Sequence, residues 1–347
     1  MKRRTFLMAT AATAALLPVG AKAASQMSDA IAALYEKAKP EGEVTWYIVP
    51  MDSETAERCG QLFTSLYPGI KVNVVRSTAT VAFQRLNQDL DTGVANCDVL
   101  TTSNIAHAED LKGRDLLTQY SPIRKEEVLP AFQGTDPDDM YHVTTAGPMG
   151  IVYNTNEVSE ADAPKNWPDL LDPKWKGKLA IGHPGFSGYV GIWATKMREL
   201  YGWEYFEKLV EQEPYVGRSS IDVVTTTAAG ETQVGAGPTT SALISAEKGN
   251  PMAMLAPTDG LVVITSPSCI LKNAPHPEAA KLFMEFLMGP EIAELTAENF
   301  STPIRGDVKV RDGVIPLSEV KVITATKEQI INEVSETAEM FRDTFGI

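Results

Sequence analysis

The first third of the chain alternates apolar runs with amphipathic segments. β-branched and aromatic residues predict buried strands at 43–50, 70–77 and 97–104. Apolar residues at helical spacing predict helices around Ile31–Tyr35, from a cap at Ser53 to Leu66, and from about Ala79 to Asp91. Strands and helices that alternate in this way need crossover connections. We therefore expect an α/β fold with a mostly parallel sheet covered by helices.

The same alternation starts again after residue 176. It predicts a strand, helix, strand, helix and strand at 177–182, 188–200, 231–237, 239–249 and 251–257. A second run of this kind, well separated from the first, indicates a second α/β lobe.

Two extended apolar segments, 141–156 and 260–269, lie between the two runs. Neither ends where a single lobe would need it to end, so we interpret both as strands that cross from one lobe to the other. The resulting fold has two lobes with a ligand cleft between them. The expected division is lobe 1 at 26–147, lobe 2 at 148–263, the rest of lobe 1 at 264–305, and a C-terminal segment at 306–347 that packs on lobe 2.

The N-terminus has the features of an export signal. Lys2, Arg3 and Arg4 precede an apolar stretch that ends near Val19, and 21–23 fits a small-residue cleavage site. The Arg pair also matches a twin-arginine signal, which marks proteins exported in the folded state. The apolar stretch is too short to span a bilayer. We expect residues 1–23 to be a signal peptide cleaved near Ala23.

Charge excludes one class of partner. The chain has 31 Lys and Arg against 45 Asp and Glu, and four of the basic residues but no acid lie in 1–23, which leaves 27 against 45, or about −18. Nucleic-acid affinity rests on clustered Lys and Arg, so we expect no nucleic-acid partner. Three scattered cysteines do not suggest a zinc site or a disulfide scaffold, although Cys59 and Cys97 are able to pair in an oxidising compartment.

Candidate ligand contacts follow the strands, because open α/β sheets bind ligands beyond the carboxyl ends of their strands, where helices begin. The loops at these positions are rich in hydroxyl groups and glycine. The candidates are Asp52, Ser53, Arg76, Ser77, Thr78, Ser103, His183, Ser187, Gly188, Arg218, Ser219, Ser220, Thr239, Thr240 and Asp259.

Two of these loops form a similar pair, Arg76-Ser77-Thr78 in one lobe and Arg218-Ser219-Ser220 in the other. An Arg fork beside unpaired helix N–H groups suits a carboxylate or a phosphate. The alternative for the hydroxyls is helix capping alone, and for the arginines a surface ion pair.

Catalytic motifs are lacking. The four histidines, His107, His142, His183 and His276, occur without an HExxH motif, a nucleophile elbow or a phosphate-binding P-loop. The segment GFSG at 185–188 is one residue short of a nucleophile elbow, so a secreted hydrolase is the alternative from another functional class. We expect a binding protein and no enzyme, with His183 positioning its loop or touching the ligand.

Several stretches resemble the extracellular solute-binding proteins of bacterial ABC importers, in the branch that includes periplasmic ferric-iron-binding proteins. They are YNTNEV at 153–158, PKNWPDLLDPKWKGKLAI at 164–181, the run from Asp259 to Glu291, and STPIRGDV at 301–308. The resemblance implies a two-lobed periplasmic-binding-protein fold of type II. It also implies a periplasmic receptor that delivers a small molecule to an inner-membrane permease with its cytoplasmic ATPase. We expect this receptor to be a monomer without a cofactor.

The resemblance fails at the iron ligands. Iron-binding members carry adjacent tyrosines where this chain has Thr239 and Thr240, and Met51 or a neighbour matches the histidine that often follows their first strand. Neutral hydroxyls suit ferric iron less than phenolates do. We therefore expect a small polar, anionic organic ligand and no metal. The alternatives are ferric iron and a cationic, polyamine-type ligand held by Asp52, Asp98, Glu231 or Asp259.

Overall fold

The computed structural model describes residues 19–77 and 79–347. Most of the expected signal peptide and Thr78 lie outside these residues. The helices are α1 (Val19–Ala38), α2 (Ser53–Leu66), α3 (Ala79–Asp91), α4 (Ile105–Gly113), α5 (Gly188–Tyr201), α6 (Glu204–Glu211), α7 (Ser220–Ala228), α8 (Thr239–Glu247), α9 (Pro277–Leu287), α10 (Pro290–Ala297), α11 (Lys327–Asn332) and α12 (Val334–Phe345). The strands are β1 (Glu43–Ile48), β2 (Lys71–Arg76), β3 (Val99–Thr101), β4 (Tyr141–Asn154), β5 (Leu179–Gly182), β6 (Tyr215–Gly217), β7 (Val234–Pro238), β8 (Met252–Leu255), β9 (Leu261–Ile270) and β10 (Val322–Ile323).

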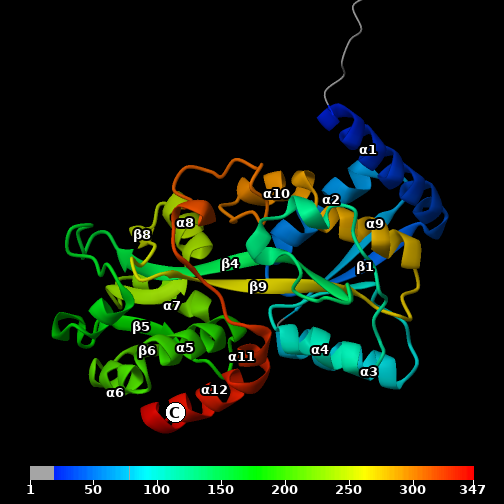
Figure 1. The fold of residues 1–347 in the computed structure, drawn as a ribbon. Coiled ribbons are helices and arrows are strands. Elements are labelled where there is room, and N and C mark those ends of the chain that lie inside the picture. The colour runs from blue at the N-terminus through cyan, green and yellow to red at the C-terminus, as the bar shows by residue number, and fades with distance from the viewer. Residues whose placement is uncertain (1–18, 78) are drawn as a thin grey trace, which may run out of the picture.

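Two lobes lie side by side, joined by the long strands β4 and β9 (Figure 1). Lobe 1 contains β1–β3 with α1–α4, α9 and α10, and lobe 2 contains β5–β8 with α5–α8. The mixed α/β architecture and the two-lobed arrangement confirm the fold predicted from the sequence.

Hydrogen bonding forms one path of strands, in the order β2-β1-β3-β9-β4-β7-β5-β6. β4 and β9 pair antiparallel from Tyr141↔Cys269 to Met149↔Val262. β9 also bonds to β3 of lobe 1, while β4 also bonds to β7 and β8 of lobe 2. The strands of both lobes therefore belong to one continuous sheet. The sheet is mixed and not mostly parallel as expected, because the crossing strands β4 and β9 pair antiparallel with each other and with their neighbours β3, β7 and β8.

Local sequence explains the helices that face the cleft. In α2, Ala56, Cys59 and Phe63 recur every three or four residues and are fully buried against lobe 1. The helix begins one residue earlier than we predicted: Asp52, and not Ser53, is the N-cap, because its carboxylate accepts the Thr55 backbone N–H at 2.9 Å.

The tryptophan-rich segment at 166–175 anchors the entry to lobe 2. Asn166 and Asp169 form a reciprocal capping box, and Trp167 is fully buried with its indole N–H donating to the Gly260 carbonyl at 2.9 Å. Asp259 accepts the Trp167 backbone N–H at 3.0 Å. This segment thus fixes the start of β5 against the start of β9.

The C-terminal segment contacts both lobes. Phe341 of α12 packs on Phe206 of α6, and Trp203 donates to the Thr344 hydroxyl at 3.0 Å. Lys327 of α11 pairs with Glu109 of α4 in lobe 1 at 3.2 Å. The segment therefore bridges the lobes on the side that carries α11 and α12 (Figure 1).

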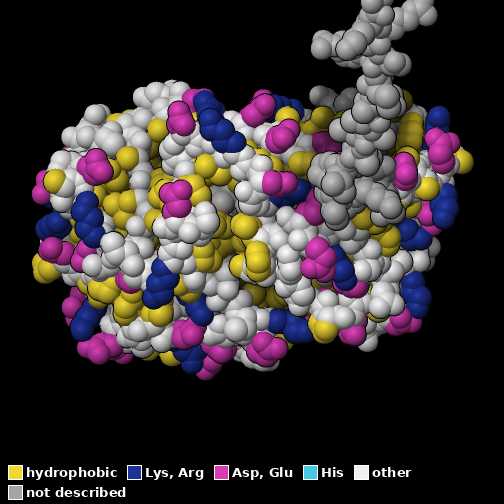
Figure 2. All heavy atoms as spheres, turned by 45° about the horizontal axis from the view of Figure 1, so that its top comes forward, with side chains coloured by type: hydrophobic (Ala, Val, Ile, Leu, Met, Phe, Trp, Pro, Cys, Tyr) yellow, Lys and Arg dark blue, Asp and Glu magenta, His cyan; other side chains and the backbone are white. Residues whose placement is uncertain are grey.

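Surface charge is mixed. Figure 2 shows acidic and basic side chains interspersed over one face, without a large patch of either sign. In the described part of the chain, no helix combines the length and apolar character needed to cross a membrane.

Candidate ligand-binding site

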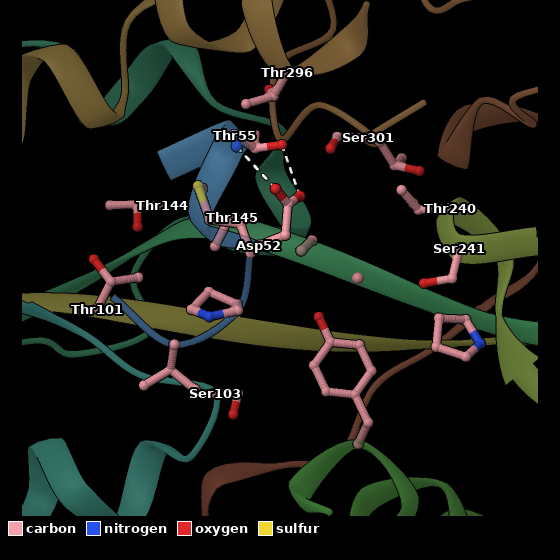
Figure 3. A pocket seen from close by; sticks show the side chains of 18 of the residues that line it. Asp52, Thr55, Thr101, Ser103, Thr144, Thr145, Thr240, Ser241, Thr296 and Ser301 are labelled. Atoms are coloured by element: carbon pink, nitrogen blue, oxygen red, sulfur yellow. Dashed lines mark hydrogen bonds between the residues drawn. The ribbon is translucent and has the colours of Figure 1, made fainter. Parts of the chain in front are cut away.

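A cavity of about 540 Å³ lies between the two lobes, beside the crossing strands. Strand ends and helix starts from both lobes line it, and Figure 3 shows hydroxyl side chains pointing inward from several elements. The lining hydroxyls are Thr55, Thr101, Ser103, Thr144, Thr145, Ser187, Tyr189, Ser219, Ser220, Thr240, Ser241, Thr296, Ser301 and Thr302. A cavity of this size suits a small organic molecule.

Only two of the described residues that line the cavity carry a formal charge, Asp52 and Arg76, and both come from lobe 1. Asp52 accepts hydrogen bonds from the Thr55 N–H at 2.9 Å and from the Thr55 hydroxyl at 2.7 Å (Figure 3). Partial burial alone would raise the pKa of Asp52, but these hydrogen bonds lower it below its usual value. Asp52 is therefore a carboxylate at neutral pH.

Arg76 is the last residue of β2, next to β1 in the sheet. Its Nε donates to the Met51 carbonyl at 3.1 Å, which ties it to the loop that follows β1. Its side chain is exposed on the cavity wall. A guanidinium uses one of its five N–H donors in such a bond, so the others remain available for a ligand.

Lobe 2 lines the cavity with helix N-termini, and none of its described lining residues carries a charge. Ser187 is the N-cap of α5, and its hydroxyl lies 3.5 Å from the Val190 N–H. Ser219 is the N-cap of α7, where it forms a capping box with Asp222. Ser220 of α7 and Thr240 of α8 also line the cavity. The first backbone N–H groups of a helix lack partners within the helix, so these termini favour negative charge.

The N-terminus of α8 has no side-chain cap, because Pro238 occupies the N-cap position. The Thr240 hydroxyl donates to the Phe300 carbonyl at 3.1 Å, which ties α8 to the segment that follows α10 of lobe 1. This helix start thus combines an uncapped N-terminus with a connection across the cleft.

Tyr189 is a lining residue that the strand-end reasoning missed. It lies in the first turn of α5, and a Cβ added to Gly147 of β4 would fall 2.0 Å from its hydroxyl. Only a glycine at 147 leaves room for the ring. Burial raises the pKa of Tyr189 to about 12, so the phenol is a neutral hydrogen-bonding group. The available signal is its position directly after the candidate Gly188.

The structure brings eight of the fifteen candidate residues to this cavity. They are Asp52, Arg76, Ser103, Ser187, Gly188, Ser219, Ser220 and Thr240. The contact between the lobes is close here: a Cβ added to Gly188 would lie 3.8 Å from the Ser103 hydroxyl.

His183 and Arg218 lie outside the cavity and line a second hollow of about 560 Å³. The Arg218 guanidinium lies over the Phe186 ring, 5.3 Å from its centroid. His183 Nδ1 accepts the Gly185 N–H at 3.0 Å, which shapes the loop before α5, and burial lowers its pKa. The expected pair of facing arginines is therefore not formed in the cavity.

The other four described candidates also lie outside the cavity lining: Ser53, Ser77, Thr239 and Asp259. Thr239 is buried, with its hydroxyl 3.4 Å from the Pro148 carbonyl. Asp259 accepts from the Trp167 N–H and the Tyr201 hydroxyl, so it holds the tryptophan-rich segment. Ser53 is exposed in the first turn of α2, and the Ser77 N–H donates to the Ile48 carbonyl at 3.2 Å.

Asp98, one candidate for binding a cationic ligand, is fully buried in lobe 1. It accepts the backbone N–H groups of Thr45 and His276, each at 2.7 Å, and lies 3.0 Å from the His276 ring. Its carboxylate is satisfied by these groups, which makes it a structural residue.

Groups that would support catalysis or metal binding do not assemble in the described residues. No serine hydroxyl bonds to a histidine ring there; His107 pairs with Thr102, His142 with the Tyr120 carbonyl and His276 with Asp98. No three His, Cys, Asp or Glu side chains cluster within 19–77 and 79–347 in a way that could hold a metal ion. Cys59, Cys97 and Cys269 are buried free thiols, so the pairing considered for Cys59 and Cys97 is not formed.

Two bacterial proteins are similar to this chain in sequence. An uncharacterized protein of Haemophilus influenzae is 26% identical over 196 residues, a match that spans 52% of this chain and only 55% of that protein. A putative 2-aminoethylphosphonate-binding periplasmic protein of Salmonella typhimurium is 23% identical over 285 residues and 78% of each chain.

Solved structures share the fold. The periplasmic binding protein AfuA from Actinobacillus pleuropneumoniae, with fructose-6-phosphate bound, has a TM-score of 0.74 at 23% identity, covering 88% of this chain and 99% of that one. Iron-bound HitA from Pseudomonas aeruginosa has a TM-score of 0.74 at 20% identity, covering 87% and 99%. The family model described as bacterial extracellular solute-binding protein matches residues 97–326, more than half of the chain. The chain therefore belongs to the family of bacterial extracellular solute-binding proteins.

Proposed function

We propose that this family member captures a small anionic organic molecule in the cavity between its lobes and delivers it to an ABC permease. The observation that carries the proposal is the convergence of the α5, α7 and α8 N-termini from lobe 2 with Arg76 from lobe 1. Unpaired N–H groups and a guanidinium both favour negative charge, and together they suit a carboxylate, phosphate or phosphonate.

Two relatives make this ligand class plausible on chemical grounds. The Salmonella relative is described as a putative binder of a phosphonate, and AfuA holds a sugar phosphate. The cavity of this chain is large enough for either kind of molecule. Both ligands carry an oxyacid group that matches the N-termini of lobe 2.

Ferric iron is the second candidate, because iron-bound HitA shares the fold. Where iron-binding members carry adjacent tyrosines, this chain has Thr239 and Thr240. Thr239 is buried outside the cavity lining, and the Thr240 hydroxyl already donates to the Phe300 carbonyl. Tyr189 is the single phenol among the described lining residues. Hard, anionic oxygen ligands for ferric iron are therefore few, and the anionic organic ligand is the better proposal.

The proposed transport cycle uses the crossing strands as a hinge. In this proposal residues 26–147 and 264–305 form one closing body and 148–263 the other. The segment 306–347 packs on the second body through α12, and the Lys327–Glu109 contact with α4 of the first body would have to adjust during closure. Contacts made by the ligand with both bodies would favour the closed form. We further propose that residues 1–23 are a signal peptide cleaved near Ala23, that the protein acts as a periplasmic monomer, and that it has no enzymatic activity.

A thermal-shift screen of the purified protein tests the proposed ligand class. The screen compares carboxylates, phosphonates, sugar phosphates, amines and ferric iron, since a ligand that binds only the folded state raises the melting temperature. We expect an anionic organic compound to give the largest shift. A coloured, stoichiometric ferric complex formed without an added anion, or a shift with amines alone, would overturn the proposal.

A further inference from the structure

Asp52 is an unpaired carboxylate on the wall of a cavity that otherwise favours anions. In the described part of the chain, no Lys, Arg or His forms an ion pair with it, and its two hydrogen-bond donors both belong to Thr55. Arg76, the other charged lining residue, bonds to the Met51 carbonyl and not to Asp52. The two opposite charges of lobe 1 thus remain separately available to a ligand.

The capping role alone does not account for an acid at position 52. An asparagine or serine caps a helix about as well as an aspartate, and neither adds a charge. The Thr55 hydroxyl that donates to Asp52 also accepts the Asn299 side-chain N–H at 3.1 Å, so the surroundings hold the carboxylate in place. Each carboxylate oxygen keeps a lone pair free for another donor.

A purely anionic ligand would leave this carboxylate close to a like charge and without a partner when the lobes close. A purely cationic ligand would leave Arg76 and the N-termini of α5 and α8, which have no acidic residue in their first turns, without an anionic partner. Opposite charges on one ligand satisfy both sets of groups, and unmatched charges in a closed cavity oppose binding.

We propose that the ligand is a zwitterion, in which an ammonium group binds Asp52 while an oxyacid group binds Arg76 and the N-termini of α5, α7 and α8. This inference rests on the proposed function and assigns one end of the same ligand. It makes Asp52 the residue that selects amine-bearing anions over plain anions.

Matched pairs of compounds test the assignment by isothermal titration. The pairs are 2-aminoethylphosphonate with ethylphosphonate, phosphoethanolamine with ethyl phosphate, and β-alanine with propionate, each differing by one amino group. With the wild-type protein, we expect the amine to improve the affinity of the best pair by about tenfold to a hundredfold, the range of a charge-assisted hydrogen bond.

Asp52→Asn removes the charge and keeps a side chain that caps α2. We expect it to abolish the preference for the amine. The melting temperature should fall slightly, because the Thr55 hydroxyl loses its carboxylate acceptor while the Thr55 N–H keeps one. Glu54→Gln is the matched control, because it removes an exposed acid from the first turn of the same helix outside the cavity lining. This control should keep the full preference.

Three outcomes overturn the inference. If the wild type binds both members of its best pair equally, the zwitterion is wrong and the anionic ligand stands. If Asp52→Asn keeps the preference, the ammonium binds elsewhere. If the wild type binds no member of any pair while another anion stabilises it in the thermal-shift screen, the zwitterion is wrong and the anionic function stands.

Discussion

The strand end that carries Arg76 and the strand end that carries Arg218 look alike in the sequence and differ in the structure. Both put an Arg before two hydroxyl residues and a helix. After β2, the Arg lines the cavity; after β6, the hydroxyls Ser219 and Ser220 line it while Arg218 covers the Phe186 ring outside. Neighbours distant in sequence make the difference, Met51 for Arg76 and Phe186 for Arg218. A strand end therefore identifies the loop that meets a ligand, but not the side chain that does so.

The largest expected effect is a loss of folding stability at low pH, and it concerns α3, the helix that follows Arg76. Phe83 of α3 stacks on His107 of α4 with ring centroids 4.1 Å apart, and burial lowers the pKa of His107 from 6.5 to about 4. The unfolded chain therefore takes up this proton first as the pH falls. The free energy of unfolding is therefore highest above pH 6.5, where His107 is neutral in both states. It falls between pH 6.5 and about 4, by on the order of 2–3 kcal/mol.

Denaturant unfolding of the wild type and of His107→Gln across pH 4–7 measures this effect. The variant lacks the titrating group, so its free energy of unfolding should depend less steeply on pH in this window. Equal pH slopes for the two proteins would show that the pKa of His107 is not lowered in the folded protein, so the burial of its ring against Phe83 would need revision.

The second effect concerns the end of β6. A Cβ added to Gly217 would lie 2.6 Å from the Asp222 Cβ, and Asp222 forms the capping box with Ser219. Gly217→Ala should therefore displace the α7 N-terminus and cost about 2 kcal/mol of stability. Thermal unfolding checks this against Gly113→Ala, a control with nothing within 4 Å of the added Cβ. Equal melting temperatures would contradict the tight packing at this strand end.

A smaller effect is expected from the cap itself. Ser219→Ala removes the hydroxyl that accepts the Asp222 N–H at 3.3 Å and should cost about 1 kcal/mol in thermal unfolding. Ser219→Asn supplies another capping group and should restore most of that loss. If the two variants were equally destabilised, the hydroxyl would have a role other than capping.

The sequence predicted the α/β class and the crossing strands, because periodicity reports which faces are buried. It did not predict the antiparallel pairing at the centre of the sheet, which depends on strands distant in sequence. The crossing strands β4 and β9, at Tyr141–Asn154 and Leu261–Ile270, lie where two extended apolar runs fitted neither lobe alone. Helix α3 has the predicted limits, Ala79 and Asp91.

The site was predictable only in part, because periodicity does not report side-chain direction across the cleft. Asp52, Ser187 and Thr240 were selected from strand-end loops and line the cavity, but Tyr189 lies in a helix turn and was not selected by that rule. Asp259 was selected by the same rule but lies outside the cavity lining, where its carboxylate accepts the Trp167 backbone N–H.

Isothermal titration of Arg76→Ala and Arg218→Ala with the anion that stabilises the wild type most is the most direct test of the central claim. Arg76 lines the cavity and Arg218 does not. We predict that Arg76→Ala weakens binding by about 1.5–3 kcal/mol, the range for a lost charge-assisted hydrogen bond, and that Arg218→Ala changes it by less than about 0.5 kcal/mol. A large loss with Arg218→Ala beside an unaffected Arg76→Ala would contradict the account.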